Sequence, residues 1–249
     1  MIERAAEHLV AVDRDTAIAL GIHVSADGAM PQILVTDRSK PVGSVHVWAG
    51  FSSAQVFFDN RQSNGQLFAS IRMHGENAQC IFNEAGKNFV AISVLNMRSH
   101  RQNFFIGDKS TAVELSIEME GEDRICVIGD DALISSGVWM RNHDMHSIVD
   151  LDSKAIINRQ PGDILIERHV WISQDVLCVG EQAIGFGAIL GARSFVKRPI
   201  PPKSIVAGMP ATVIRSGVSW GRQSGHVSDE ELAVIEYLST LDAEPAMEG

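Results

Sequence analysis

The stretch from Ile166 to Ile200 reads IERHVWISQDVLCVGEQAIGFGAILGARSFVKRPI and repeats in steps of six. A bulky apolar residue opens each step, and a mostly small or β-branched residue follows four positions later. The bulky positions are Ile166, Ile172, Cys178, Ile184, Leu190 and Val196, and the later positions are Val170, Val176, Gln182, Ala188, Ser194 and Ile200, with Gln182 the misfit. A helix cannot keep residues six apart on one face, whereas short flat strands separated by turns can. The period predicts a parallel β-helix in which three short strands make one triangular coil.

A second tract of the same pattern lies upstream. It contains Ile128, Ile134 and Met140 as bulky residues, with Ala132 and Val138 at the small positions. Between Met140 and Ile166 there are more residues than one 18-residue coil can hold, because the two positions are 26 apart. We therefore expect a loop, at 141–160, that bulges out from the stack.

The flanking segments are expected to cover the ends of the stack. Residues 2–20 are Ala-rich, with Ile2, Ala6, Leu9 and Val10 on one helical face, so they predict a helix. Over 22–105 the hexads degrade into strand-like runs that we interpret as irregular coils or a strand-rich cap. Ser228 and Glu231 form a capping box that predicts a short C-terminal helix.

This pattern predicts an all-β chain in three segments. Residues 1–45 form an N-terminal helix and strand cap, residues 46–215 form the β-helix, and residues 216–249 form a C-terminal tail and helix. Three cysteines, an odd number without metal-site spacing, are expected to be reduced core residues.

Composition limits the function classes. The net charge of −10 argues against a nucleic-acid binder. No run of about 18 apolar residues is present, and charges are scattered through the first residues, so we expect a cytoplasmic protein without a membrane span. The segment from Gln182 to Ser228 has no Asp or Glu but contains several Lys and Arg. It indicates either a local anionic ligand or a subunit contact.

Three further stretches carry a family resemblance. They are RNHDMHSIVD at 141–150, IERHVWISQDVL at 166–177 and PPKSIVAGMPATVIR at 201–215. Together they resemble the hexapeptide-repeat acyltransferases, which are left-handed parallel β-helix proteins, above all the branch of bacterial capsule and polysialic acid O-acetyltransferases. The resemblance implies transfer of an acetyl group from acetyl-CoA to a saccharide hydroxyl by a homotrimer, with active sites between the subunits.

The resemblance also assigns a base. His146 matches the position of the family's catalytic histidine, and an imidazole with a pKa near 6.5 suits removal of a hydroxyl proton. His143 is the competing candidate, because a related branch of xenobiotic acetyltransferases places its base in a pair like Asn142-His143. Asp144 either orients one of these rings or caps a turn. We expect Asn142, His143 and Asp144 to contact the acceptor.

The remaining predicted site residues follow from the same resemblance. Trp171 matches a tryptophan whose indole N–H points toward the developing oxyanion in the polysialic acid branch, and it could equally form a wall of the acetyl-CoA groove. Gln174 and Ala192, one coil apart, match positions that contact the coenzyme. Positions near its phosphates are matched by Lys197, Arg198 and Arg215. No metal is expected.

Two other functions remain open. A γ-class carbonic anhydrase would use His143, His146 and His169 as zinc ligands, although its close histidine pair is spaced differently. A non-catalytic β-helix, acting as a scaffold or binding protein, is the other alternative.

Overall fold

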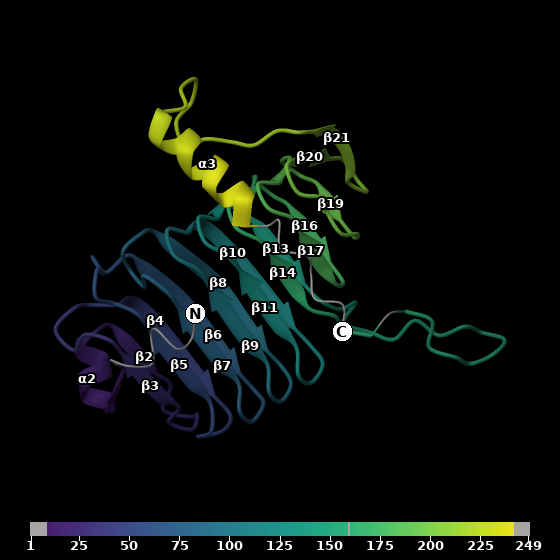
Figure 1. Ribbon diagram of the computed structural model, residues 1–249. Coiled ribbons are helices and arrows are strands. Elements are labelled where there is room, and N and C mark those ends of the chain that lie inside the picture. Colours follow the sequence, from purple (N-terminus) through teal and green to yellow (C-terminus); the bar gives the residue numbers. More distant parts are fainter. Residues whose placement is uncertain (1–8, 159, 242–249) are drawn as a thin grey trace.

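A computed structural model describes residues 9–158 and 160–241 of the chain. Short strands stack into a long left-handed parallel β-helix, with the first strands at one end and the last at the other (Figure 1). Neighbouring strands of the described stack pair in parallel except at its two ends. There, β1 (Val10–Val12) pairs antiparallel with β3 (Gln32–Val35), and β21 (Thr212–Ser216) pairs antiparallel with β20 (Ser204–Ala207).

One side of the β-helix is a ladder of short strands. In spatial order after β3 these are β5 (Gln55–Phe58), β7 (Gln79–Phe82), β9 (Asn103–Ile106), β11 (Ile125–Ile128), β14 (Ile164–Ile166) and β17 (Gln182–Ile184). The opposite side starts with longer strands, which are β2 (Ile22–Val24), β4 (Gly43–Ala49), β6 (Leu67–Met73), β8 (Val90–Met97) and β10 (Thr111–Met119).

Beyond β10 the long side divides in two. The strand β10 pairs first with β12 (Leu133–Ile134) and then with β13 (Val138–Arg141). The β12 column continues with β15 (Trp171–Ile172) and β18 (Ile189–Leu190) to β20, and the β13 column with β16 (Leu177–Val179) and β19 (Phe195–Val196). The coils therefore change from two-sided to triangular.

The coil length changes at the same place. Val56 pairs with Cys80 and Cys80 with Phe104, so these wide coils repeat every 24 residues. Ile164 pairs with Gln182, which gives the 18-residue coil that the hexads predict. Each inward residue stacks on its partner in the next coil, so a repeat in sequence becomes a column in the core.

The interior is filled by these columns. The Phe82 ring packs between Phe58 and Phe104, with ring centroids 5.3 and 5.5 Å away. Every predicted inward position between Ile166 and Ile200 is buried, which confirms the hexad assignment. The misfit Gln182 is also buried, and its amide nitrogen donates to the carbonyl oxygens of Val179 and Gly180.

The helix expected near the N-terminus is present only in part. Of the helix expected over 2–20, residues 2–8 lie outside the described residues, and Val10–Val12 form β1 instead. The helix prediction is wrong for Val10, because these residues pair with the open edge of β3. The helix α2 (Arg14–Ala19) follows, capped by the Asp13 carboxylate, which accepts from the Thr16 N–H.

At the C-terminus the expected helix is present as α3 (Asp229–Leu241). The Glu231 N–H donates to the Ser228 hydroxyl oxygen, and the Ser228 N–H donates to the Glu231 carboxylate, so the capping box is confirmed. No helix among residues 9–158 and 160–241 is long and apolar enough to cross a membrane. Parallel pairing already begins at β2 and β3, and the segment boundaries at residues 45 and 215 stay predictions.

Candidate functional site

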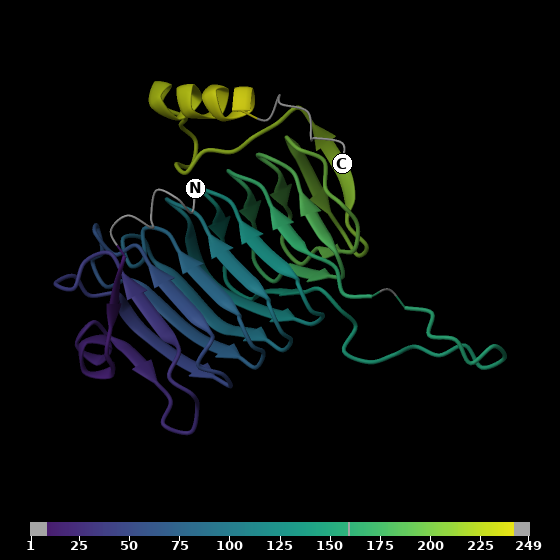
Figure 2. The same ribbon diagram turned by 60° about the horizontal axis from the view of Figure 1, so that its bottom comes forward.

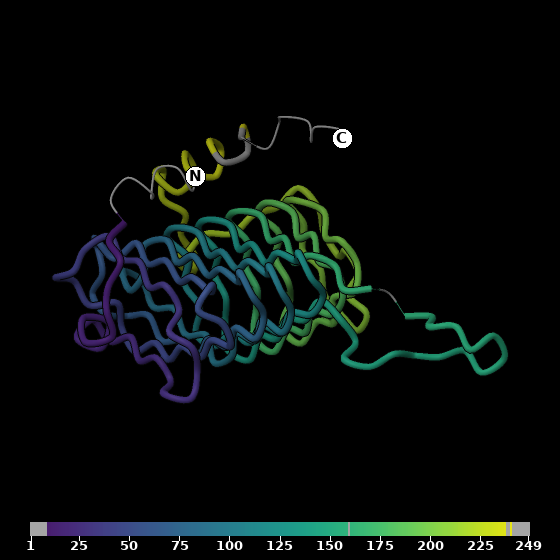
Figure 3. Tube along the Cα trace, turned by 90° about the horizontal axis from the view of Figure 1, so that it is seen from below, coloured from purple at the N-terminus to yellow at the C-terminus, as the bar shows by residue number. Residues whose placement is uncertain are grey.

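A long arm leaves the stack between β13 and β14 and projects away from the body of the molecule (Figures 1 and 2). We define the arm as the described residues of 142–163, which exclude 159. Its two halves meet at an isolated antiparallel bridge between Val149 and Ile156, and the Ile157 N–H donates to the Ile148 carbonyl oxygen. The bulge expected between Met140 and Ile166 is therefore present as a narrow hairpin-like projection. Figure 3 shows the same projection from below.

Asn142 holds the base of this arm. Its side-chain nitrogen donates to the carbonyl oxygens of Glu120 and Gly162, at 2.9 and 2.7 Å, and its side-chain oxygen accepts from the Glu120 N–H at 2.9 Å. The carboxamide thus connects both ends of the arm to the coil below. These bonds explain why an asparagine is buried there, since buried polar groups need partners.

A cleft of about 580 Å³ opens where the arm meets the last coils. Its walls come from the base of the arm, from two successive coil corners and from the reversal before β21. Of the predicted site residues, the cleft brings together Asn142, His143, Asp144, Lys197 and Arg198. It also includes Asn158 and Glu181, which the sequence analysis did not select and for which the sequence held no signal.

His143 lies in this cleft in a defined tautomer. The Met145 N–H donates to its Nδ1 atom at 2.9 Å, so the ring proton of the neutral imidazole is on Nε2. The Nε2 atom is buried and has no hydrogen-bond partner among the described residues. Burial lowers the pKa of His143, against the opposing effect of Glu120 and Glu118. The neutral ring therefore carries an N–H donor, rather than a basic lone pair, at its buried Nε2 atom.

His146 lies further along the arm and is exposed. Its carbonyl oxygen accepts from the Asn158 side-chain nitrogen at 3.1 Å, and the same nitrogen donates to the Asp144 carboxylate at 3.2 Å. Within the described part of the chain the His146 ring forms no hydrogen bond. Asn158 thus fixes the backbone at His146 and leaves the imidazole free.

Trp171 lies on a different side of the coil. It is half-buried on β15, with its ring centroid 6.3 Å from that of Trp220. In the triangular coil, β15 is the side opposite the corner from which the arm departs. Trp171 and the arm of the same chain are therefore separated by the core.

Next to Trp171, four residues fasten the C-terminal tail to the coil, and we call them the C-terminal latch. Asp131 accepts from His169 Nδ1 at 2.7 Å and from the Arg222 guanidinium at 2.5 Å. The Trp220 ring stacks on His169 with centroids 4.3 Å apart, and its Nε1–H donates to the His169 carbonyl oxygen at 2.8 Å. Sequence reasoning missed Trp220 because 51 residues separate it from His169.

The contacts of the C-terminal latch decide whether His169 is free to bind zinc, as a γ-class carbonic anhydrase would require. His169 Nε2 lies 3.0 Å from the Trp220 carbonyl oxygen, so both ring nitrogens of His169 already have partners. Among the described residues there is no group of three or more His, Cys, Asp or Glu arranged to hold a metal ion. A zinc site that uses His169 would require the latch to open.

The predicted coenzyme residues fall at separate places. Gln174 and Ala192 share one corner, where the Arg193 N–H donates to the Gln174 carbonyl oxygen at 2.8 Å. Lys197 and Arg198 are exposed in the cleft, and the Lys197 ammonium lies 5.5 Å from the centroid of the Phe195 ring. Arg215 is exposed on β21, opposite Ile205. A single chain therefore does not gather all the predicted residues at one point.

Comparison with known proteins places this geometry in context. No family model matches the chain. The polysialic acid O-acetyltransferase of Escherichia coli O1:K1 is 31% identical over 114 residues, which cover 46% of this chain and 37% of that protein. The galactoside O-acetyltransferase of Escherichia coli K12 is 33% identical over 96 residues, which cover 38% of this chain and 45% of that protein. The chain thus spans about half or less of the length of these curated relatives.

Among solved structures, the polySia-specific acetyltransferase NeuO superimposes with a TM-score of 0.60 at 21% identity, covering 91% of this chain and 92% of that one. At that identity the likeness establishes the fold. Together with the relatives in sequence, it confirms the resemblance of this chain to the hexapeptide-repeat acyltransferases, with polysialic acid O-acetyltransferases among its relatives.

Proposed function

We propose that this protein transfers the acetyl group of acetyl-CoA to a hydroxyl of a saccharide. The observation that carries the proposal is its sequence similarity to proteins named as polysialic acid and galactoside O-acetyltransferases. The free imidazole of His146 and the cleft at the base of the same arm are compatible with that chemistry.

In the proposed reaction His146 is the general base. The saccharide oxygen attacks the thioester carbonyl carbon while the imidazole takes the hydroxyl proton. The carbon–sulfur bond then breaks, the acetyl ester forms, and the departing thiolate takes the proton from the imidazolium. His143 is less suited to the role, because its Nδ1 already accepts a hydrogen bond and its Nε2 carries the proton. It is suited instead to donate a hydrogen bond to the acceptor.

The basic side chains of the cleft suit the coenzyme. Lys197 and Arg198 form no ion pair within the described residues, and the surrounding segment from Gln182 to Ser228 has no carboxylate. Both can face the phosphates of acetyl-CoA. Gln174 and Ala192 line a corner where the coenzyme's extended arm would bind, with Trp171 as the wall or the oxyanion donor.

We propose that the complete site forms between the subunits of a homotrimer. The arm and Trp171 lie on opposite parts of one coil, so the arm would meet the Trp171 side of a neighbouring copy. The arm exposes large apolar side chains that suit such a contact, namely Ile148, Leu151, Ile156 and Ile157. Because acetyl-CoA is an intracellular donor, we place the reaction in the cytoplasm.

The direct test measures free thiol released from acetyl-CoA in the presence of a panel of saccharides. His146→Ala should lower turnover by about 10²–10⁴-fold, the range for a missing general base, while coenzyme binding is retained. His226→Ala is the matched control, because His226 is exposed on the C-terminal tail, and its turnover should equal that of the parent. If His143→Ala is the inactive variant and His146→Ala is active, the assignment of the base is wrong. Failure to bind coenzyme A at all would favour a scaffold.

A mixing experiment tests the shared site. His146→Ala and Trp171→Ala should each be inactive alone. If each site takes its arm from one copy and its tryptophan from the next, random mixing of equal amounts restores about a quarter of the parent turnover. No recovery after the subunits have exchanged would contradict a site shared in this way.

A further inference from the structure

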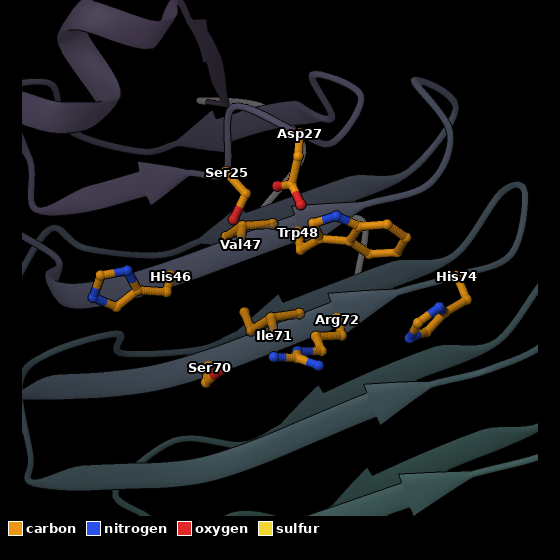
Figure 4. A pocket seen from close by; sticks show the side chains of 9 residues that line it. All are labelled: Ser25, Asp27, His46, Val47, Trp48, Ser70, Ile71, Arg72 and His74. Atoms are coloured by element: carbon orange, nitrogen blue, oxygen red, sulfur yellow. The ribbon is translucent and has the colours of Figure 1, made fainter.

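A second concavity lies far from the arm, on the outer face of the first coils. It has a volume of about 360 Å³, within the range of small-ligand pockets. Figure 4 shows the side chains of the residues that line it, which come from β4, from β6 and the residue after it, and from the turn after β2. We call this concavity the outer hollow. Its polar lining residues are Ser25, Asp27, His46, Trp48, Ser70, Arg72 and His74.

The hollow combines an aromatic wall with unpaired charges. The rings of Trp48 and His74 lie 4.8 Å apart, inclined by 45°. Arg72 is the strand partner of Trp48, and within the described residues its guanidinium forms no hydrogen bond or ion pair. The Asp27 carboxylate is also without a partner there, although it lines the same hollow (Figure 4). Two opposite charges that share a hollow without pairing leave room for a ligand between them.

The chemistry of this lining selects a ligand class. A guanidinium binds a carboxylate through two parallel hydrogen bonds. An indole offers an apolar face for a sugar ring and an N–H for a hydroxyl. Asp27, His46 and Ser70 supply acceptors and donors for further hydroxyls. The set therefore suits a sugar that carries a carboxylate.

A similar pair recurs nearer the arm. Along the strand ladder Arg72 pairs with Asn96, Asn96 with Glu118, and Glu118 with Arg141. Arg141 lies 6.0 Å from the Trp139 ring centroid, and its buried Nε atom has no partner among the described residues. Three strand spacings separate Arg72 from Arg141, or about 14 Å. Both arginines thus lie beside a tryptophan on one outward column, which ends next to Asn142 at the base of the arm.

The acidic charge between these two pairs is offset in part. Arg98 contacts the carboxylates of Glu118 and Glu120 at 3.3 and 3.9 Å. One arginine offsets only one of these two negative charges, so the middle of the column stays acidic, and the two arginines at its ends keep their positive charge available. A polymer with a carboxylate on each unit would engage both ends.

We infer that the outer hollow binds one unit of an acidic polysaccharide whose chain continues along this column to the cleft at the arm. The inference rests on the proposed function and names the class of its acceptor. The hollow holds the polymer, and the cleft acetylates a unit of the same chain. Binding through the hollow contributes to affinity for long acceptors and leaves the chemical step unchanged.

The test compares long polysialic acid fragments with the disaccharide, in calorimetric binding and in the thiol-release assay. Arg72→Ala and Trp48→Ala should weaken binding of the long fragments about tenfold and raise their KM by the same factor, with kcat unchanged. In the thiol-release assay both variants should treat the disaccharide as the parent does, because a disaccharide is too short to reach from the hollow to the cleft. Arg72→Lys keeps the positive charge but loses the two parallel hydrogen bonds that a guanidinium can donate. Its affinity for long fragments should therefore lie between those of the parent and Arg72→Ala. Arg61→Ala is the control, because Arg61 is paired with Asp59 outside the hollow.

Several results would overturn the inference. They are equal binding of long fragments by parent and Arg72→Ala, an equal rise in the KM for acetylation of long fragments and of the disaccharide, equally tight binding of neutral dextran, and a changed oligomeric state of the variants. A parent that acetylates no saccharide but binds long fragments through Arg72 would refute the proposed function and leave the hollow's ligand supported.

Discussion

Asp108 lies at a coil corner where carboxylates gather, and its substitution should stabilise the protein. Burial raises the pKa of Asp108 to about 6, with further contributions from Asp130, Glu84 and Asp59. The side chain forms no hydrogen bond among the described residues. Lys87 offsets only part of its charge at neutral pH, and Asp108→Asn removes the charge while keeping the shape.

The magnitude follows from the pKa. A rise of about 2 pH units corresponds to about 3 kcal/mol at full strength, and solvent screening of this half-buried group reduces it to about 1 kcal/mol. The folded-state pKa exceeds the unfolded value, so the folded state binds the proton more tightly. The penalty is absent below pH 3.8, grows as pH rises toward 6, and is complete above that.

Thermal unfolding of parent and Asp108→Asn at two pH values measures the effect. At pH 7.5 the variant should have a Tm about 2–4 °C higher, and at pH 3.5 the difference should vanish. Asp152→Asn on the exposed arm is the control and should change neither value. A variant that is less stable at pH 7.5, or equally stabilised at both pH values, would refute the reasoning.

Further outcomes are expected from other parts of the fold. Phe82→Ala should cost about 3–5 kcal/mol in denaturant unfolding because it empties the middle of the buried phenylalanine stack, whereas Phe51→Ala, at an exposed ring, should cost far less. Burial alone would raise the pKa of Asp131, but the hydrogen bonds from His169 and Arg222 outweigh burial and lower it. Asp131→Asn should therefore reduce the stability of the fold at pH 7, and this loss of stability should disappear as the pH falls below 3.8. Burial raises the pKa of all three cysteine thiols, to about 12 for Cys178, so a thiol reagent should label them only after unfolding.

The hexads made the triangular coils predictable because each six-residue step contributes the same inward pair. The wide coils were less visible, since their repeat is a 24-residue spacing such as Val56 to Cys80 to Phe104, carried by different residue types. Strand propensity over short stretches of sequence correctly predicted strands in the wide coils, but a stretch as short as one strand does not include its partner in the next coil. The strand at Val10 was missed for a related reason, because its partner β3 is supplied by the fold.

The candidate site was predictable only in part. The spacing of Met140 and Ile166 required a projecting segment, and the cleft at its base gathers His143, Lys197 and Arg198 as neighbours. The sequence did not indicate that Trp171 lies on the far side of the coil, because a linear pattern does not specify which corner faces which. It also did not reveal the latch or the outer hollow, whose members come from separate coils.

The division of β10 into the β12 and β13 columns separates the wide coils from the narrow triangular coils of the same stack. The wide coils pair with one another in parallel, with register shifts between β6 and β8 and between β8 and β10, so a coil inserted or removed among them would leave the pairing of the narrow coils unchanged. Each such change would move Arg72 and Arg141 apart or together by one strand spacing, about 4.8 Å. The number of wide coils would then set the distance, along a bound polymer, between the sugar unit held at Arg72 and the unit that is acetylated.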